Sequence, residues 1–273
     1  MLSQDQINAL IEIVRVTAKA EITPHFRALS SQQIDAKTAP DDLVTVADRA
    51  AELALTKAIH EFLPQAQIVG EEAVSADKSV LSRVKESGLV VVIDPIDGTW
   101  NYANGIATYG VILAVVEDGK TIFGMLYDPS FDDWIMASRG QGAFFCKADG
   151  SQTQLVLPAP PDELSDCMGF VGLYLFSKDR QAELAATLPR FRRTMTLRCS
   201  CHEYRMLTQG NSQFCLNGML NVWDHAAGVL IYEEAGGIAR LLDGRSYDPA
   251  MRKGHLLTAA SERLWEQLAE LFV

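Results

Sequence analysis

The stretch LVVVIDPIDGTWNY, residues 89–102, joins a fully apolar run to two aspartates, a proline and a glycine–threonine pair. Continuous apolar residues over Leu89–Ile93 predict a strand that is buried on both faces. A strand that runs directly into polar residues presents them at its carboxyl end, where ligand sites of α/β proteins usually lie. We therefore expect Asp94 and Asp97 to stand at such a site.

The residues between these aspartates favour a cation site. Pro95 fixes its own backbone and favours an extended conformation at Asp94, so both carboxylates can converge while the carbonyl of Ile96 turns inward. Oxygen ligands alone suit a hard cation, and Mg²⁺ is the first choice because it keeps several waters and is often completed by a phosphate. The competing interpretation is that Asp-Pro and Asp-Gly make turns and nothing more.

Gly98 and Thr99 fit a phosphate beside the cation. A glycine lets the backbone approach a ligand closely, and residues 100–102 can open a short helix whose free N–H groups face an anion. The Thr99 hydroxyl adds a group that orients a water molecule. The sequence thus predicts one turn that holds a cation and a phosphate together.

Other acidic residues stand at similar positions along the chain. Glu71 follows the short predicted strand 67–69, and Asp224 begins a predicted helix. Each has an ordinary alternative, since aspartate is a common helix cap and Gly-Glu-Glu is often a solvated turn. Asp48 likewise completes a capping box with Thr45. We expect His225 to be a surface residue of its helix and not a ligand.

Composition limits the classes of function. The chain has 273 residues, 48% of them hydrophobic, which is enough for a substantial core. A formal charge of −11, from 35 acidic and 24 basic residues, leaves no basic stripe for a nucleic-acid backbone. No apolar run is long enough for a membrane span. The partner that we expect is therefore a small molecule, with neither nucleic acid nor membrane.

Cysteine usage and the N-terminus indicate a cytoplasmic protein. Five cysteines at irregular spacing are typical of reduced thiols. The one-residue gap between Cys199 and Cys201, with His202 next to them, is a poor match to structural zinc spacing. The N-terminal residues show an early acidic side chain and apolar residues at helical spacing in place of an export signal.

The pattern along the chain predicts two halves. Capping boxes open helices near Ser3 and Thr45, and residues 107–145 read as successive short strands joined by turns, an antiparallel meander. From about residue 150 helices and strands alternate, ending in a helix capped by Ser261. We place the division near residue 146, giving halves of residues 1–145, with most of the acidic motifs, and 146–273.

Four motifs in order resemble the inositol monophosphatase family of magnesium-dependent, lithium-sensitive phosphatases. They are residues 42–48 (DLVTVAD), 70–72 (GEE), 94–99 (DPIDGT) and 223–228 (WDHAAG). The resemblance implies a layered α/β/α/β/α sandwich, with an antiparallel sheet in the N-terminal half, an α/β C-terminal half and the site between them. It also implies a homodimer.

The resemblance also implies a role for each residue of the motifs. One Mg²⁺ would be held by Glu71, Asp94 and the Ile96 carbonyl, a second by Asp94, Asp97 and Asp224, and a third, weaker one by Glu71. The attacking water would be oriented by Asp48 and Thr99, with Glu71 helping to take its proton, and the phosphate would be bound by the amides of Gly98 and Thr99. Lys37 lies on the loop that this family moves over the site.

Departures from the family pattern fall on the side of the leaving alcohol. The family has an acidic residue seven positions before the aspartate that corresponds to Asp224, and this chain has Asn217 there. The family's Gly-Thr-Ala-Ala run is replaced around residues 199–204 by larger side chains, including Glu203, which would attract an amine. The expected substrate is a small polyol or sugar phosphate. Histidinol phosphate, another phosphate ester, and a role as a protein partner of the transcription machinery stay open.

Overall fold

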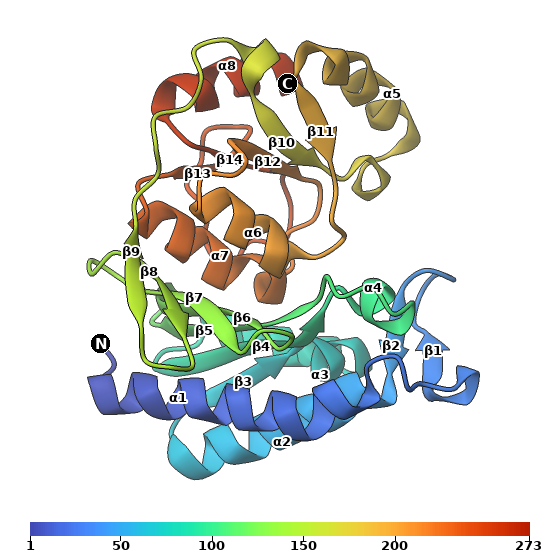
Figure 1. Ribbon diagram of the computed structural model, residues 1–273, viewed down its shortest axis with the longest axis vertical. Coiled ribbons are helices and arrows are strands. Elements are labelled where there is room, and N and C mark those ends of the chain that lie inside the picture. The colour runs from blue at the N-terminus through green and yellow to red at the C-terminus, as the bar shows by residue number, and fades with distance from the viewer.

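Two large sheets and three layers of helices alternate in the structure, a computed structural model that describes residues 1–273 (Figure 1). The layers run from α1 and α2, through the first sheet, α6 and α7, and the second sheet, to α5 and α8. This arrangement confirms the expected α/β/α/β/α sandwich. No helix is both long enough and apolar enough to span a lipid bilayer.

The first sheet has seven strands in chain order: β3 (Gln67–Gly70), β4 (Leu89–Asp97), β5 (Gly110–Glu117), β6 (Lys120–Asp128), β7 (Asp133–Ser138), β8 (Ala143–Lys147) and β9 (Gln152–Leu155). All neighbours are antiparallel except β3 and β4, which are parallel. The predicted meander is therefore present. The sheet continues through β8 and β9 to Leu155, beyond the change of pattern near residue 146. The sequence did not indicate β9 because this strand, Gln-Thr-Gln-Leu, is mostly polar and exposed.

Helices α1 (Gln4–Thr17) and α2 (Val46–Phe62) cover one face of this sheet. Each begins at a capping box, formed by Ser3 with Gln6 in α1 and by Thr45 with Asp48 in α2. Their apolar stripes bury side chains such as Leu10 against the inward-facing residues of β4, β5 and β6. The alternation of strand residues thus gives the sheet a second apolar face for another helical layer.

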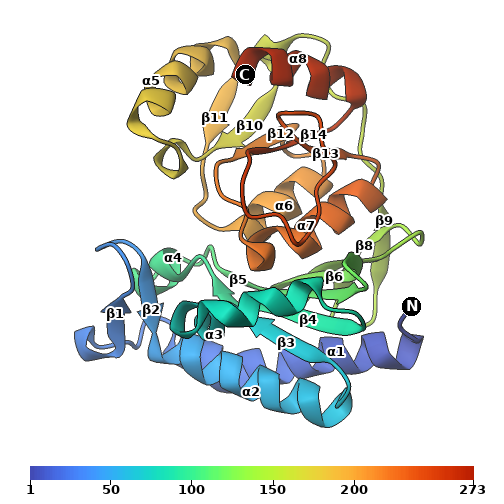
Figure 2. The ribbon, with the colours of Figure 1, turned by 180° about the vertical axis from the view of Figure 1, so that it is seen from behind.

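That second layer consists of α6 (Ser200–Thr208) and α7 (Val222–Glu234), which lie between the two sheets (Figure 2). α7 packs closely on β6 because Gly124 has no side chain, and a Cβ there would come within 2.8 Å of the Ala227 Cα. The central helices bring the first residues of α7 to the carboxyl end of β4.

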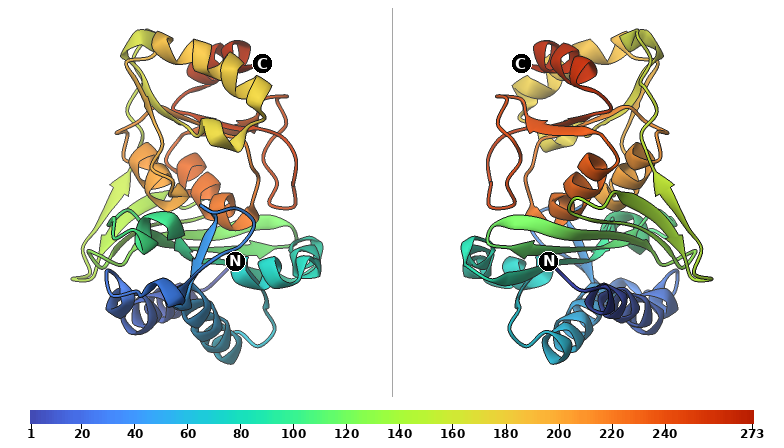
Figure 3. Two further views of the ribbon diagram at one scale, coloured as in Figure 1. Left: turned by 90° about the vertical axis from the view of Figure 1, so that its right-hand side faces the viewer. Right: turned by 90° about the vertical axis from the view of Figure 1, so that its left-hand side faces the viewer.

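The second sheet has the order β11-β10-β12-β14-β13, with bounds β10 (Met168–Val171), β11 (Arg193–Met195), β12 (Phe214–Asn217), β13 (Ile238–Leu241) and β14 (Leu256–Ala259). Strands β11, β10 and β12 are parallel, and the pairs to β14 are antiparallel. Helices α5 (Lys178–Thr187) and α8 (Glu262–Phe272) close its outer face (Figure 3). Ser261 caps α8, as predicted, by accepting a hydrogen bond from the Leu264 amide.

Three short elements gather beside the end of β4. They are the hairpin of β1 (Ile34–Ala36) and β2 (Leu43–Thr45), helix α3 (Glu71–Ala76) directly after β3, and helix α4 (Thr99–Ala103) directly after β4. The hairpin was not predicted, because its strands have only three residues each.

Candidate active site

A β-bulge at the end of β4 places Asp94 and Asp97 on the same side of the sheet. Asp94 pairs with Ile112 and Asp97 with Gly110, so three residue steps on β4 oppose two on β5. In a regular strand residues three apart point to opposite faces, and one extra residue cancels that alternation. Pro95 suits the irregular segment because it has no N–H to donate to a ladder.

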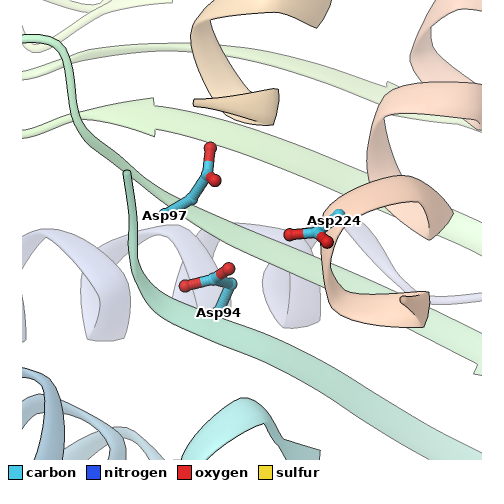
Figure 4. A group of neighbouring side chains, drawn as sticks. All are labelled: Asp94, Asp97 and Asp224. Carbon is cyan, nitrogen blue, oxygen red and sulfur yellow. The ribbon is translucent and has the colours of Figure 1, made fainter. Parts of the chain in front are cut away.

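Asp224, in the first turn of α7, completes a cluster with these two aspartates. One carboxylate oxygen from each residue lies within 4.8 Å of the others, and the three side chains point toward a common space (Figure 4). Asp94 and Asp97 are buried. The Asp94 Oδ1 atom is buried without a hydrogen-bond partner. The cluster therefore contains a buried carboxylate oxygen that no group of the chain satisfies.

The cluster has raised carboxyl pKa values. Burial, followed by the charges of Glu71, Asp97 and Asp224, raises the pKa of Asp94 well above its usual range. Burial, with Asp97 and Glu71, does the same to the pKa of Asp224. Buried carboxylates without a counter-charge disfavour ionisation, and a bound cation reverses that effect.

Asp97 is fixed by the first residues of the α6 segment. Its Oδ2 accepts hydrogen bonds from the Cys201 amide and from the Cys199 thiol, 3.1 Å away. Burial raises the pKa of Asp97 to about 6, although these hydrogen bonds lower it. All five cysteines are free and buried, as the sequence predicted, and two of them position an acidic side chain.

Asp48, Thr99 and the Ile96 carbonyl form a second group beside the aspartates. The Thr99 Oγ1 lies 3.1 Å from the Asp48 Oδ1 and 2.9 Å from the Ile96 carbonyl oxygen. The other Asp48 oxygen accepts a 2.8 Å hydrogen bond from the Thr45 amide in the capping box. Burial raises the pKa of Asp48 to about 7. One aspartate thus caps a helix and contacts the threonine of the β4 turn.

Glu71 lies next to this group but makes an ion pair that was not predicted. Lys37 Nζ is 2.9 Å from a Glu71 oxygen and 2.6 Å from a Glu72 oxygen. Glu71 is outside the three-residue cluster, but its charge raises the pKa of Asp94. The loop that carries Lys37 therefore already contacts the acidic group.

Gly98 turns the chain from β4 into α4. Its φ of +85° is in the left-handed region, and a Cβ there would lie 2.9 Å from the Thr108 carbonyl oxygen. The short helix predicted over residues 100–102 is present as α4. Only glycine therefore fits this turn without strain.

A pocket of about 150 Å³ opens from Asp97 and Asp224 toward the C-terminal half. Asn217 lines it, with its amide 3.2 Å from the Cys215 sulfur. Glu203 also lines it, but one of its oxygens accepts hydrogen bonds from the Leu197 amide and the Thr196 hydroxyl, at 2.8 and 3.3 Å.

The expectation for His225 is wrong. The residue is 2% exposed, and its ring nitrogens lie 2.8 Å from the Met219 carbonyl oxygen and 3.1 Å from the Tyr204 hydroxyl. α7 is covered on both sides by sheets, so it has no solvent face at this position. Burial lowers the pKa of His225 to about 4.

Glu52 is a supporting residue that the sequence analysis did not identify. Its oxygens each accept a 2.8 Å hydrogen bond, from the Glu72 and Ala73 amides at the start of α3. It stands four residues after Asp48 on the same face of α2. The sequence signal for Glu52 was an acidic residue four positions after Asp48, which places both on one face of the predicted helix.

Comparisons with known proteins agree with this geometry. The model of the inositol monophosphatase family matches residues 3–273. The chain is 31% identical over 213 residues to an inositol-1-monophosphatase of Mycobacterium bovis, covering 77% of this chain and 71% of the relative. It is 29% identical over 242 residues to a protein named Nus factor SuhB from Pasteurella multocida, covering 85% and 83%.

Solved structures with the same fold include the IMPase of Thermotoga maritima, with a TM-score of 0.82 at 24% identity over 98% of this chain and 97% of that chain. An inositol monophosphatase from Zymomonas mobilis has a TM-score of 0.80 at 24% identity over 99% of each chain. The family model matches nearly the whole chain, and relatives with similar sequences, such as the Mycobacterium bovis protein, carry the family's name. The chain belongs to the inositol monophosphatase family, a family of phosphatases that generally use Mg²⁺.

Proposed function

We propose that this protein is a Mg²⁺-dependent phosphomonoesterase that hydrolyses the phosphate ester of a small polyol or sugar. The observation that carries the proposal is the cluster of Asp94, Asp97 and Asp224, which brings three carboxylates from two halves of the chain to one space. Oxygen-only donors of this kind suit a hard divalent cation.

The donor set fits Mg²⁺ in two further respects. An orphaned, buried Asp94 oxygen needs a positive partner, and the raised pKa values of Asp94 and Asp224 come from burial and like charge that a cation offsets. We propose that Glu71 and the Ile96 carbonyl join the aspartates in holding two to three ions. Glu71 becomes available when its Lys37 partner moves away.

The remaining groups act on the water and the phosphate. Bound divalent ions would make the attacking water more acidic and neutralise charge on the phosphate. Asp48 and Thr99, 3.1 Å apart, orient that water, with Asp48 accepting its proton. The Gly98 and Thr99 amides, at the start of α4 where no side chain caps the helix, bind the phosphate.

The pocket beside the aspartates would receive the alcohol. Its volume of about 150 Å³ is small beside the roughly 300–1,000 Å³ of pockets for drug-sized ligands. A small alcohol that contacts Asn217 fits it best. The Glu203 carboxylate is already used by the chain, so a charged amine such as that of histidinol has less support than a neutral polyol.

A panel of phosphate esters assayed with and without Mg²⁺ tests this proposal. We expect a small polyol phosphate such as inositol 1-phosphate to be hydrolysed faster than histidinol phosphate, with Li⁺ at tens of millimolar inhibiting by competition for the second ion. Equal rates on all esters would exclude a dedicated pocket, and inactivity with Mg²⁺ would refute the proposal.

A second candidate function is a role as a protein partner of the transcription machinery. Relatives named Nus factor SuhB suggest it. The two functions separate in a strain that carries Asp94→Asn. We expect its phenotype to match that of a deletion, whereas a wild-type phenotype would favour the binding role. We also propose a homodimer, which light scattering of the purified chain tests.

A further inference from the structure

Arg198 stands at the edge of the pocket in an unfavourable backbone conformation. It follows β11 and directly precedes Cys199, whose sulfur contacts Asp97. Its φ of +52° lies in the left-handed region, which favours glycine. Residues kept in such conformations concentrate at ligand sites, where the surrounding structure holds them.

Two aromatic rings fix its guanidinium group. The Arg198 Cζ atom lies 4.5 Å from the ring centroid of Trp100 and 5.3 Å from that of Tyr174. Trp100 belongs to α4, next to Thr99, and Tyr174 belongs to the C-terminal half. Aromatic faces hold a planar guanidinium while its donors at the edge stay able to bond.

The carboxylate that Arg198 contacts is a weak partner. The Nη2 atom is 3.1 Å from an Asp41 carboxylate oxygen and 3.3 Å from the Asp41 carbonyl oxygen. The Asp41 side chain is 58% exposed, and exposed ion pairs contribute little stability. Both contacts use one nitrogen, so a bidentate anion would gain more from this group than Asp41 does.

Arg198 is also the only lysine or arginine among the residues that line the pocket. His225, which lines it too, is neutral near pH 7. The pocket is thus lined by one cation, Arg198, and by the acidic residues Asp97, Glu203 and Asp224. An arginine here repels an amine and attracts an anion.

We propose that Arg198 selects substrates whose alcohol carries a second anionic group, a carboxylate or a further phosphate, which the guanidinium binds in place of Asp41. This inference rests on the proposed phosphatase function and narrows its substrate class. The phosphate to be hydrolysed is bound by the ions that the aspartates hold, and the second anion is bound by Arg198.

Matched pairs of esters test this inference in Arg198→Gln, which keeps hydrogen bonding but removes the charge. The carboxylate pair is 3-phosphoglycerate and glycerol 3-phosphate. The phosphate pair is fructose 1,6-bisphosphate and fructose 1-phosphate. We expect the substitution to lower kcat/KM for the member with the second anionic group, in at least one pair, ten- to a hundredfold more than for its partner, with the loss mainly in KM.

Two further variants make the result specific. Arg193→Gln, an exposed arginine of the same segment, is the matched control and should leave both members of each pair unchanged. Asp41→Asn frees Arg198 and should raise kcat/KM for the preferred ester with a second anionic group about two- to threefold. A fall in this variant would contradict the exchange of Asp41 for substrate.

The results distinguish a failure of the role of Arg198 from a failure of the proposed phosphatase function. If wild type hydrolyses esters with Mg²⁺ but Arg198→Gln changes both members of each pair equally, the inference is wrong and the proposed function stands. A pair-specific loss for one anion type identifies that anion. If wild type hydrolyses no ester with Mg²⁺, the proposed function fails and the inference fails with it.

Discussion

Asp94 and Asp132 lie near strands of the same sheet, but the chain treats them in opposite ways. Both oxygens of Asp132 are bonded, by Arg15 at 2.7 and 2.8 Å, by Lys19 at 3.2 Å and by the Tyr127 hydroxyl at 3.0 Å. Arg15 chiefly lowers the pKa of Asp132. Asp94 has like charges around it and an oxygen without a partner.

The difference separates a structural acid from one that awaits a ligand. Arg15 and Lys19 both contact Asp132, so its negative charge is balanced and the carboxylate contributes to stability. At the end of β4 the fold gathers acids and supplies no arginine or lysine to Asp94. Perturbed carboxylates with like-charged neighbours in a cleft are expected at functional sites.

The largest expected effect comes from exchanging each acid for its amide. Asp94→Asn should lower Mg²⁺-dependent turnover by at least ~10³-fold, because it removes a charge from the proposed cation site. Asp132→Asn is the matched control and should keep turnover within about twofold. Phosphate release with Mg²⁺ in excess measures both. Comparable losses in the two variants would contradict the division into a structural acid, Asp132, and a ligand-binding acid, Asp94.

A smaller loss is expected from Thr99→Ala. The hydroxyl contacts Asp48 and is proposed to orient the water, so turnover should fall ~10²-fold while Mn²⁺ affinity stays the same. Steady-state kinetics and titration calorimetry on the same variant separate the two effects. An unchanged rate would exclude Thr99 from the reaction.

The same pair of substitutions should have opposite effects on stability without metal. In EDTA at pH 8, Asp94→Asn relieves like-charge repulsion and should raise the free energy of unfolding by ~1 kcal/mol, less than the equivalent of one pKa unit. Asp132→Asn breaks a bidentate ion pair at a partly exposed site and should lower it by ~1 kcal/mol. Urea unfolding measures both, and a change of the same sign in the two variants would contradict the comparison.

The smallest effect is a pH dependence at Asp132. Because the folded-state pKa of this carboxyl is below its value in the unfolded chain, about 4, its stabilisation is complete above that pH. It is lost as the pH falls through the lowered folded-state value. The difference in unfolding free energy between wild type and Asp132→Asn should therefore shrink below about pH 4, and a difference that grows there would be inconsistent with the ion pair.

The sequence predicted most of the fold because the decisive elements carry local signals. Capping boxes, a buried apolar strand and the motif after it are short-range patterns, and the resemblance placed Asp224 beside the residues of β4. The burial of His225 and the pairing of Lys37 with Glu71 depend on how distant layers pack. The left-handed conformation of Arg198 and its stacking on Trp100 have no local signature either.

The most direct test of the account is a crystal structure with Mn²⁺ and phosphate, using anomalous scattering to locate the ions. We predict at least two Mn²⁺ peaks among Asp94, Asp97 and Asp224, one of them shared with Glu71 after Lys37 has moved. A protein that binds phosphate with no Mn²⁺ among these aspartates would contradict the claim that they gather divalent cations.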